Sequence, residues 1–266
     1  MVAVPQALEW WRSEPGGAAW LERLPRLAEE LGERWRLRLG EPLAGGNVAL
    51  VLAAEREDGS PAVLKLNFPE PESEHEAEAL LFWDGDGAVR LLEHDRARRA
   101  LLLARAVPGT SALALEDDEA ARAVAAVLRR LHSRPAHGVP FRRLADEARR
   151  WAEQLPELAA TVADLLADET PPVVLHQDLH AANVLAAGDR WIAIDPKPLV
   201  GDAAFDVASL VRDRRPLVDR HVVERRLDLL ADELGHDRER MRAWSWVHAV
   251  AWGHPDEARL LRRLPA

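Results

Sequence analysis

The stretch VVLHQDLHAANVLAAGDRWIAID, residues 173–195, determines the architecture that this chain can adopt. Its first three residues are apolar and predict a short strand, and its second half predicts a strand pair joined by a tight turn at residues 188–189. Asp178 lies in the loop before the strand pair, Asn183 follows five positions later, and Asp195 ends the last strand. The stretch therefore gathers three oxygen-bearing side chains around one loop and one hairpin.

This order of residues is the arrangement of protein kinases, in which each of the three side chains has a chemical task. Asp178 would accept the proton of an attacking hydroxyl group and orient that group. Asn183 and Asp195 would supply oxygen ligands for Mg²⁺, which prefers hard oxygen donors and keeps waters and phosphates as its other ligands. We therefore predict phosphoryl transfer from ATP to a hydroxyl group, with Asp178 as the catalytic residue and Asn183 and Asp195 as the metal ligands.

The N-terminal part of the chain alternates between short apolar strands and turns, whereas the C-terminal part is mainly helical. The expected strands lie near 35–39, 48–54, 62–66, 88–93, 100–105, 173–175, 184–186 and 191–194. The expected helices lie over 6–33, 72–83, 117–133, 141–154 and 157–168, with more helices after residue 195. This pattern predicts an α+β, bilobal protein-kinase-like fold with a hinge at 103–110. Residues 1–105 would form a small nucleotide-binding lobe with an antiparallel sheet and a helical extension, and residues 106–266 a larger helical lobe with the catalytic loop and the acceptor site.

Only two of the 35 basic residues are lysines, Lys65 and Lys197, and the others are arginines. Lysine is a compact point charge and arginine a wide planar fork, so a lysine in this chain marks a position where arginine would not serve. Lys65 lies on the third expected strand, where a kinase has the lysine that holds the α- and β-phosphates. An acidic residue of the next helix should pair with it, and the candidates are Glu74, Glu76 and Glu78. Lys197 has two interpretations, a role in the reaction or an ion pair with a surface carboxylate.

Gly45, Gly46 and Asn47 lie between the first two expected strands. In the kinase interpretation these residues cover the phosphates, because glycines let backbone N–H groups approach them. A plain hairpin turn explains the same residues equally well.

The chain resembles the aminoglycoside and hydroxyurea phosphotransferases, specifically the branch that includes the streptomycin 6-phosphotransferases, over most of its length, residues 35–255. Four stretches carry the resemblance: EAEALLFWDGDGAVRLLEHD (76–95), LLLARAVPGT (101–110), VLHQDLHAANVL (174–185) and WIAIDPKPLVGDAAFDVASLVRD (191–213). The resemblance implies Asp178 as catalytic base, Asn183 and Asp195 as metal ligands, and Lys65 as a phosphate contact.

The resemblance also implies supporting roles for several residues. Glu76 is implied as the partner of Lys65, because EAEAL aligns with the E-A-x-x-L helix start of the family. Residues 103–105, from Leu103 to Arg105, are implied as the segment that contacts adenine through backbone groups. Asp206, within GDAAFD, is implied as a structural aspartate that braces the catalytic loop.

The chain departs from the wider kinase pattern in three respects. Gln177 stands where many phosphotransferases have glycine, and Asp195-Pro196-Lys197 replaces the D-F-G of protein kinases. There is no A-P-E segment and no room for an activation loop. These departures disfavour protein kinase activity and favour a small-molecule acceptor.

The acceptor implied by the resemblance is an aminoglycoside such as streptomycin, or a hydroxyurea-like antibiotic, which implies a role in antibiotic resistance or secondary metabolism. Two alternatives stay open: a kinase of the same fold for a metabolic acceptor, such as an amino sugar, an amino alcohol or a secondary metabolite, and a catalytically silent nucleotide-binding protein. The intact set of Lys65, Asp178, Asn183 and Asp195 speaks against the silent protein. The sequence predicts neither a choice between ATP and GTP nor an oligomeric state.

The composition restricts the partners and the compartment. The formal net charge of −10 argues against a nucleic-acid partner and favours a cationic small substrate, although solubility alone also explains it. The chain has no cysteine and no run of eighteen apolar residues, and its N-terminus does not have the pattern of a signal peptide. We therefore expect a cytoplasmic enzyme with no membrane partner.

Two groups of residues have competing explanations. His176 and His180 are four residues apart, as in the zinc motif H-E-x-x-H, but that motif needs a helix and a glutamate, and Gln177 cannot act as a base. Hydrogen bonds from the two histidines to the backbone of the catalytic loop are the preferred explanation. Trp244, His248 and Trp252 share one helical face. Core packing is the default interpretation of that face, and a wall of the acceptor pocket is the alternative.

Overall fold

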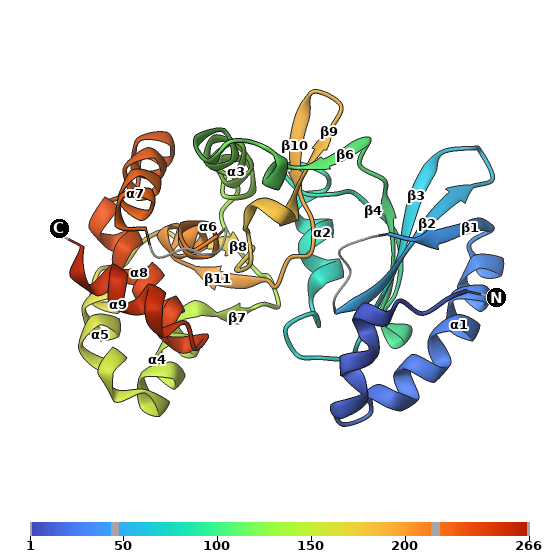
Figure 1. Cartoon of the computed structure of the whole chain (residues 1–266), viewed down its shortest axis with the longest axis horizontal. Helices are drawn as coiled ribbons and strands as arrows, with labels where there is room; N and C mark the ends of the chain where they lie inside the picture. Colours follow the sequence, from blue (N-terminus) through green and yellow to red (C-terminus); the bar gives the residue numbers. More distant parts are fainter. Residues whose placement is uncertain (1, 44–47, 214–218, 265–266) are drawn as a thin grey trace. The chain divides into compact units, whose positions relative to one another are not determined.

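The computed structural model describes residues 2–43, 48–213 and 219–264, and the chain divides into two compact units (Figure 1). Unit 1 comprises residues 1–85 and 89–106, and unit 2 comprises residues 86–88 and 107–266. No helix in the described part of the chain combines the length and the apolar composition that a membrane crossing requires.

Unit 1 is built on an antiparallel sheet of five strands in the order β1-β2-β3-β5-β4. The strands are β1 (Leu37–Pro42), β2 (Ala49–Arg56), β3 (Pro61–Asn67), β4 (Leu91–Asp95) and β5 (Ala100–Ala104). All five lie close to the predicted ranges, because each is an apolar run bounded by turn residues. The antiparallel N-terminal sheet that the sequence predicts is therefore confirmed.

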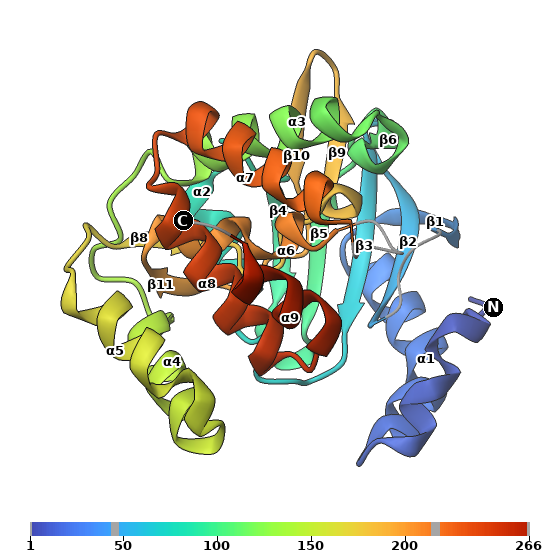
Figure 2. The ribbon, with the colours of Figure 1, turned by 60° about the vertical axis from the view of Figure 1, so that its left-hand side comes forward.

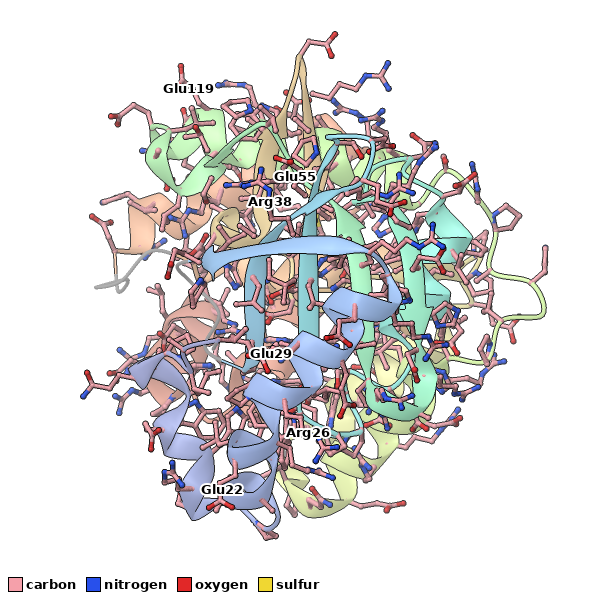
Figure 3. All side chains as sticks on the ribbon, turned by 90° about the vertical axis from the view of Figure 1, so that its right-hand side faces the viewer. Glu22, Arg26, Glu29, Arg38, Glu55 and Glu119 are labelled. Carbon is pink, nitrogen blue, oxygen red and sulfur yellow. The ribbon has the colours of Figure 1, made fainter. Side chains whose placement is uncertain are left out.

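The two faces of this sheet have different tasks, because successive side chains of a strand point to opposite faces. Leu50, Leu52, Leu64 and Leu66 are fully buried and form one apolar core with the helix α1 (Gly17–Arg34). Figure 3 shows the charged side chains Glu22, Arg26 and Glu29 on α1, and all three are exposed. The opposite parity of β3 carries Lys65 and Asn67, whose side chains contact the helix α2 (Glu76–Trp83).

Two helices of unit 1 differ from the prediction. The helix predicted over 6–33 is split into the 3₁₀ helix η1 (Gln6–Ser13) and α1, because Gly16 has a φ of +81°. A residue in this left-handed conformation interrupts a right-handed helix, and glycine adopts the conformation without steric cost. Helix α2 begins at Glu76 rather than at residue 72. The residues before it form a turn, in which the Ser73 hydroxyl donates to the carbonyl of Glu70 at 3.3 Å and competes with helix formation.

In its described residues, unit 2 is mainly helical and contains two small sheets (Figure 2). Its helices are α3 (Asp117–Leu131), α4 (Leu144–Gln154), α5 (Ala159–Ala167), α6 (Ala208–Val211), α7 (Arg220–Leu234), α8 (Arg238–Ala251) and α9 (Pro255–Arg263). One sheet has the order β10-β9-β6, with β6 (Pro108–Ser111), β9 (Val184–Ala187) and β10 (Arg190–Ala193). The other has the order β7-β11-β8, with β7 (Arg142–Arg143), β8 (Val173–Leu175) and β11 (Leu199–Gly201). Together with unit 1, this confirms the predicted α+β fold.

Three of these strands, β6, β7 and β11, are absent from the sequence prediction. Each has four residues or fewer, so no hydrophobic period can develop along it. They form because a partner strand lies beside them: β6 pairs with β9, and β11 pairs with both β7 and β8. Residues 108–109 had been predicted as a break only, because proline and glycine usually end regular structure.

The core of unit 2 has an aromatic centre. Trp244 and Phe205 are fully buried and meet edge to face with 5.5 Å between ring centroids. His248 is also buried and stacks on Trp252 with 4.1 Å between centroids. Core packing, the default interpretation of the Trp244, His248 and Trp252 face, is therefore confirmed for the first two residues.

Candidate active site

Lys65 of unit 1 is held by a buried ion pair. Its Nζ lies 2.6 Å from Glu76 Oε1, and the two side chains are 5% and 3% exposed. Strand β3 and the first turn of α2 supply these residues, which confirms that Glu76, among the three candidates, is the partner of Lys65. A paired and buried ammonium has a fixed direction, which suits a cation that must meet a phosphate at one place.

Asn67 completes this arrangement and was not assigned a role from the sequence. Its Nδ2 donates to Glu76 Oε2 at 2.7 Å, so both carboxylate oxygens of Glu76 are engaged. Asn67 follows Lys65 by two positions on β3, and both side chains therefore face the same side of the sheet. The scarcity of asparagine in this chain and that two-residue spacing were the signals that could have found it.

The other nucleotide contacts predicted in the N-terminal part have a mixed outcome. Leu103 is buried in β5, and the N–H groups of Ala104 and Arg105 donate to Arg90 and Pro61 at 2.9 and 3.3 Å. These two donors are therefore engaged by the protein, and a backbone contact of residues 103–105 with adenine stays a prediction. The predicted phosphate loop, Gly45, Gly46 and Asn47, lies outside the described residues.

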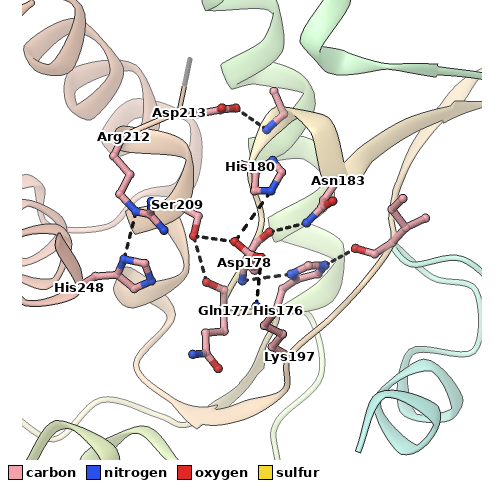
Figure 4. Close-up of polar contacts among 12 residues, drawn as sticks. His176, Gln177, Asp178, His180, Asn183, Lys197, Ser209, Arg212, Asp213 and His248 are labelled. Carbon is pink, nitrogen blue, oxygen red and sulfur yellow. Dashed lines mark hydrogen bonds and ion pairs between the residues drawn. The ribbon is translucent and has the colours of Figure 1, made fainter. Parts of the chain in front are cut away.

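Asp178 of unit 2 lies in the loop after β8, and its side chain is 29% exposed. Around it, Ser209 Oγ lies 3.5 Å from Oδ1, His180 Nε2 lies 3.9 Å from Oδ1, and Lys197 Nζ lies 3.6 Å from Oδ2 (Figure 4). None of these contacts is as short as the 2.5–2.9 Å that is typical of a charge-assisted hydrogen bond. The carboxylate is thus oriented by its surroundings and still accessible to a substrate hydroxyl group.

Asn183 and Asp195 are brought together by the hairpin of β9 and β10. The N–H of Ile194 donates to the carbonyl of Asn183 at 2.9 Å, so Asp195 follows directly on the residue opposite Asn183. The side-chain Nδ2 of Asn183 donates to the carbonyl of Asp178 at 2.9 Å. Because this bond engages the amide nitrogen, the amide oxygen is the atom that can serve as a ligand.

This pair of donors fits Mg²⁺ in its chemistry. An amide oxygen and a carboxylate are hard ligands, and Mg²⁺ is usually bound by one or two protein groups, with phosphates and waters completing its shell. Within the described ranges, no group of three or more His, Cys, Asp or Glu side chains could hold a metal ion. The amide oxygen of Asn183 and the carboxylate of Asp195 therefore suit a cation whose other ligands are phosphates and waters.

Asp206 fastens the loop that carries Asp178 to the core. Its carboxylate accepts hydrogen bonds from the N–H of His176 at 2.8 Å, from the N–H of Gln177 at 2.6 Å, and from His132 Nε2 at 2.9 Å. Burial by itself raises the pKa of Asp206, but the hydrogen bond and the charge of His132 outweigh burial and leave this pKa below its ordinary value. The bracing role implied for Asp206 is therefore confirmed by its contacts.

His176 supports the same loop and cannot serve as a zinc ligand. Its Nε2 donates to the carbonyl of Ile194 at 2.9 Å, and its Nδ1 accepts from the N–H of Asp178 at 3.3 Å. Both ring nitrogens are engaged, and burial lowers the pKa of His176, so the ring is neutral. The zinc alternative is excluded, and the predicted contact with the loop backbone is confirmed for His176. His180 contacts the Asp178 carboxylate instead.

Gln177 occupies the position where many phosphotransferases have glycine, and the backbone explains why. Its φ is +68°, in the left-handed region that disfavours residues with a Cβ atom. Its N–H donates to Asp206, and its carbonyl accepts from Ser209 Oγ at 3.1 Å. These tertiary hydrogen bonds hold the residue in a conformation that it would not adopt alone.

Three supporting residues were not found from the sequence: His132, Ser209 and Asp213. His132 contacts Asp206, Ser209 contacts Gln177 and Asp178, and Asp213 Oδ2 accepts from the N–H of Ala181 at 2.6 Å. Ser209 and Asp213 both lie in the segment 191–213 that carries the family resemblance, which was the available signal. His132 lies in no quoted motif, so no sequence signal pointed to it.

Known proteins similar to this chain are phosphotransferases. Residues 34–256 match the family described as "Aminoglycoside/hydroxyurea antibiotic resistance kinase". A streptomycin 6-kinase from Streptomyces glaucescens is 41% identical over 254 residues, which cover 86% of this chain and 82% of the relative. A hydroxyurea phosphotransferase from Kitasatospora aureofaciens is 41% identical over 276 residues, which cover 94% of this chain and 79% of the relative. Among solved structures, a choline/ethanolamine kinase family protein from Mesorhizobium loti matches with a TM-score of 0.63 and 18% identity, over 87% of this chain and 90% of that one, so the fold is shared.

Proposed function

We propose that this chain, which belongs to the aminoglycoside/hydroxyurea antibiotic resistance kinase family, transfers the γ-phosphoryl group of ATP to a hydroxyl group of a cationic aminoglycoside such as streptomycin. The chain is a small-molecule phosphotransferase, like the relatives that it matches over most of their length. The aminoglycoside acceptor is supported by the similarity to streptomycin 6-kinase and by the net charge of −10, which favours a cationic substrate. Since ATP is the donor, we assign the reaction to the cytoplasm.

One observation supports this function above the others: the Asp178 carboxylate is accessible, while the loop that carries it is fixed from several sides. The Asp178 side chain is 29% exposed, whereas the neighbouring Asp206 side chain is fully buried. Asp206 accepts hydrogen bonds from two consecutive backbone N–H groups just before Asp178. The Nδ2 of Asn183 donates to the Asp178 carbonyl and also restricts the loop. An exposed base on a fixed loop can position a hydroxyl group, and positioning supplies much of the catalysis in phosphoryl transfer.

In the reaction, the oxygen of the acceptor hydroxyl group forms a bond to the γ-phosphorus, and the bond from that phosphorus to the β,γ-bridging oxygen breaks. ADP leaves with the bridging oxygen, and the hydroxyl proton passes to the Asp178 carboxylate. Lys65, fixed in direction by Glu76, would donate hydrogen bonds to the α- and β-phosphates. Mg²⁺ held by Asn183 and Asp195 would neutralise charge on the phosphates when it is bound.

An acceptor screen tests the proposal. The purified chain is given ATP and Mg²⁺, and ADP release is measured with streptomycin, other aminoglycosides, hydroxyurea, amino sugars and amino alcohols. Asp178→Asn serves as the matched control because it keeps the side-chain shape and removes the base. We expect streptomycin to raise ADP release well above the Asp178→Asn background, and ³¹P NMR to show one phosphate ester. If streptomycin has no effect and only an amino sugar or amino alcohol is phosphorylated, the proposed acceptor class is wrong.

A further inference from the structure

A cavity of about 390 Å³ lies in unit 1 beside helix α1. Arg23 and Arg26 line it from α1, and Arg98 and Arg99 line it from the turn between β4 and β5. The described residues that line the cavity all belong to unit 1, and Lys65 is not among them. Sites for small ligands usually have volumes of roughly 300–1,000 Å³, so this cavity is large enough for one.

The lining of this cavity is basic, although the chain as a whole has a formal net charge of −10. Beside the four arginines, Glu30 is the one acidic residue among the described lining residues. Its Oε1 lies 2.8 Å from Arg26 Nε, so this carboxylate is engaged by one of the four. Arg98 pairs with Asp95, which lies outside the lining, at 2.9 Å. The lining therefore carries more positive than negative charge.

A second cavity of unit 1, which α1, β1 and β2 line, has the opposite arrangement of charge. Its volume is about 700 Å³, and its described lining contains four glutamates and three arginines. Each of these arginines is paired with a carboxylate. The pairs are Arg36 with Glu57, Arg38 with Glu55, and Arg56 with Asp58, at 3.3, 2.5 and 3.4 Å. The high arginine content of the chain therefore does not by itself explain a cavity with excess positive charge.

Arg23 and Arg99 are the two arginines of the basic cavity that take part in no ion pair within the described ranges. Nη1 of Arg99 is buried and has no hydrogen-bond partner in the described part of the chain. The backbone holds Arg99 at this place, since its carbonyl accepts from the N–H of Asn67 at 3.0 Å and its φ is +52°. A buried donor without an acceptor is unfavourable and rare, and a bound anion would supply the acceptor.

The chemistry of the lining indicates the class of anion. A guanidinium is a planar fork of donors that matches the oxygens of a phosphate or a carboxylate. Arginines from two separate segments line the cavity, and the oxygens of a phosphate point in several directions, whereas the two oxygens of a carboxylate lie in one plane. Trp20 and Leu27 add apolar surface to the same lining, and Trp20 is 5% exposed. An organic group attached to the phosphate would therefore have a surface to pack against.

We propose that this cavity of unit 1 binds a small organic phosphate, with the phosphate group held by Arg23 and Arg99 and the organic part packed against Trp20. The site is separate from the place of the ATP phosphates, which the proposed function assigns to Lys65. The inference does not depend on the transfer reaction or on the identity of its acceptor, because it concerns binding to unit 1 alone.

Titration calorimetry of the whole chain with phenyl phosphate tests the site, and inorganic phosphate, benzoate and phenol are the comparison probes. Arg99→Gln and Arg23→Gln each remove one guanidinium. Arg23 is exposed on α1, so its variant should leave the fold intact. Arg38→Gln is the matched control, because Arg38 is exposed on β1 (Figure 3) and lies outside the basic cavity. Lys65→Gln removes the other phosphate contact that unit 1 offers.

We expect one equivalent of phenyl phosphate to bind, inorganic phosphate to bind more weakly and phenol not to bind. Arg23→Gln and Arg99→Gln should each raise the Kd for phenyl phosphate at least about tenfold, whereas Arg38→Gln and Lys65→Gln should change it less than about twofold.

Three results would overturn the inference. The first is that wild type binds neither phosphate, or that Arg23→Gln binds phenyl phosphate as tightly as the Arg38→Gln control. The second is a loss of binding in Lys65→Gln alone, which would place the phosphate at the nucleotide contact. The third is tighter binding of benzoate than of phenyl phosphate, which would make the ligand a carboxylate.

Discussion

Replacing Asp206 by asparagine removes an acceptor from a carboxylate that three donors share. Oδ2 accepts from the N–H of His176 and from His132, and Oδ1 accepts from the N–H of Gln177. The asparagine amide has one acceptor oxygen and one NH₂ group. In its best orientation it keeps the two bonds at the Oδ2 position and turns its NH₂ group toward the N–H of Gln177, so that two donors face each other.

The expected cost follows from this arrangement. Losing a hydrogen bond to a charged group costs about 1.5–3 kcal/mol, and leaving a buried donor unpaired costs about 1–3 kcal/mol. The sum agrees with the cost of about 3–5 kcal/mol for breaking a buried ion pair by removal of one partner. We therefore expect Asp206→Asn to lower the free energy of unfolding of unit 2 by about 3–5 kcal/mol.

The assay is guanidinium unfolding followed by tryptophan fluorescence, since Trp151 and Trp244 lie in the core of unit 2. Asp189→Asn is the matched control: Asp189 is 93% exposed, and its variant should stay within about 0.5 kcal/mol of wild type. Under conditions where Asp206→Asn is folded, its kcat should also fall, because a catalytic loop displaced by about 1 Å can lose about 100-fold in rate. A variant as stable as the control, with an unchanged kcat, would refute the reasoning.

The other predictions concern unit 1 and acidity. Glu76→Gln leaves Lys65 buried without its counter-charge, so KM for ATP should rise at least about tenfold in steady-state kinetics, and a change of less than twofold would contradict the role of the pair. Burial lowers the pKa of His176 and of His248, so the unfolded chain binds more protons below about pH 6.5 and stability must fall there as the pH falls. Below about pH 6.5, urea unfolding measured at pH 7.5 and 5.5 should show that the free energy of unfolding falls by up to about 1.4 kcal/mol per pH unit for each histidine. The fall should be smaller in His248→Gln. A free energy of unfolding that holds or rises on acidification would contradict this prediction.

The sequence predicted those elements and site residues whose signals lie close together in the chain. The strand at 173–175 and the hairpin of β9 and β10 agree with the prediction, because each is bounded by proline, glycine or aspartate. The strand and the next helix limited the partners of Lys65 to Glu74, Glu76 and Glu78, and the resemblance to the family selected Glu76 among them. The segment from Asp178 to Asp195 was found because its spacing has a chemical reason.

Long-range contacts escaped the same reasoning. His132 and Asp206 are 74 positions apart, and Ala181 and Asp213 are 32 apart, so no periodicity connects them. Strands β6, β7 and β11 escaped for a related reason, since their order depends on partner strands rather than on their own residues. The unpredicted part of the site is therefore its support, which depends on how distant segments pack.

The proposed role of Asp178 as the base of the transfer can be tested directly in a single turnover. Asp178→Ala and wild type are mixed with ATP, Mg²⁺ and the acceptor identified in the screen, and the rate of phosphoester formation is compared with ATP affinity from calorimetry. With Asp178 as the base, the rate should fall at least about 100-fold while the Kd for ATP changes by less than about threefold. A single-turnover rate within about threefold of wild type would contradict this assignment.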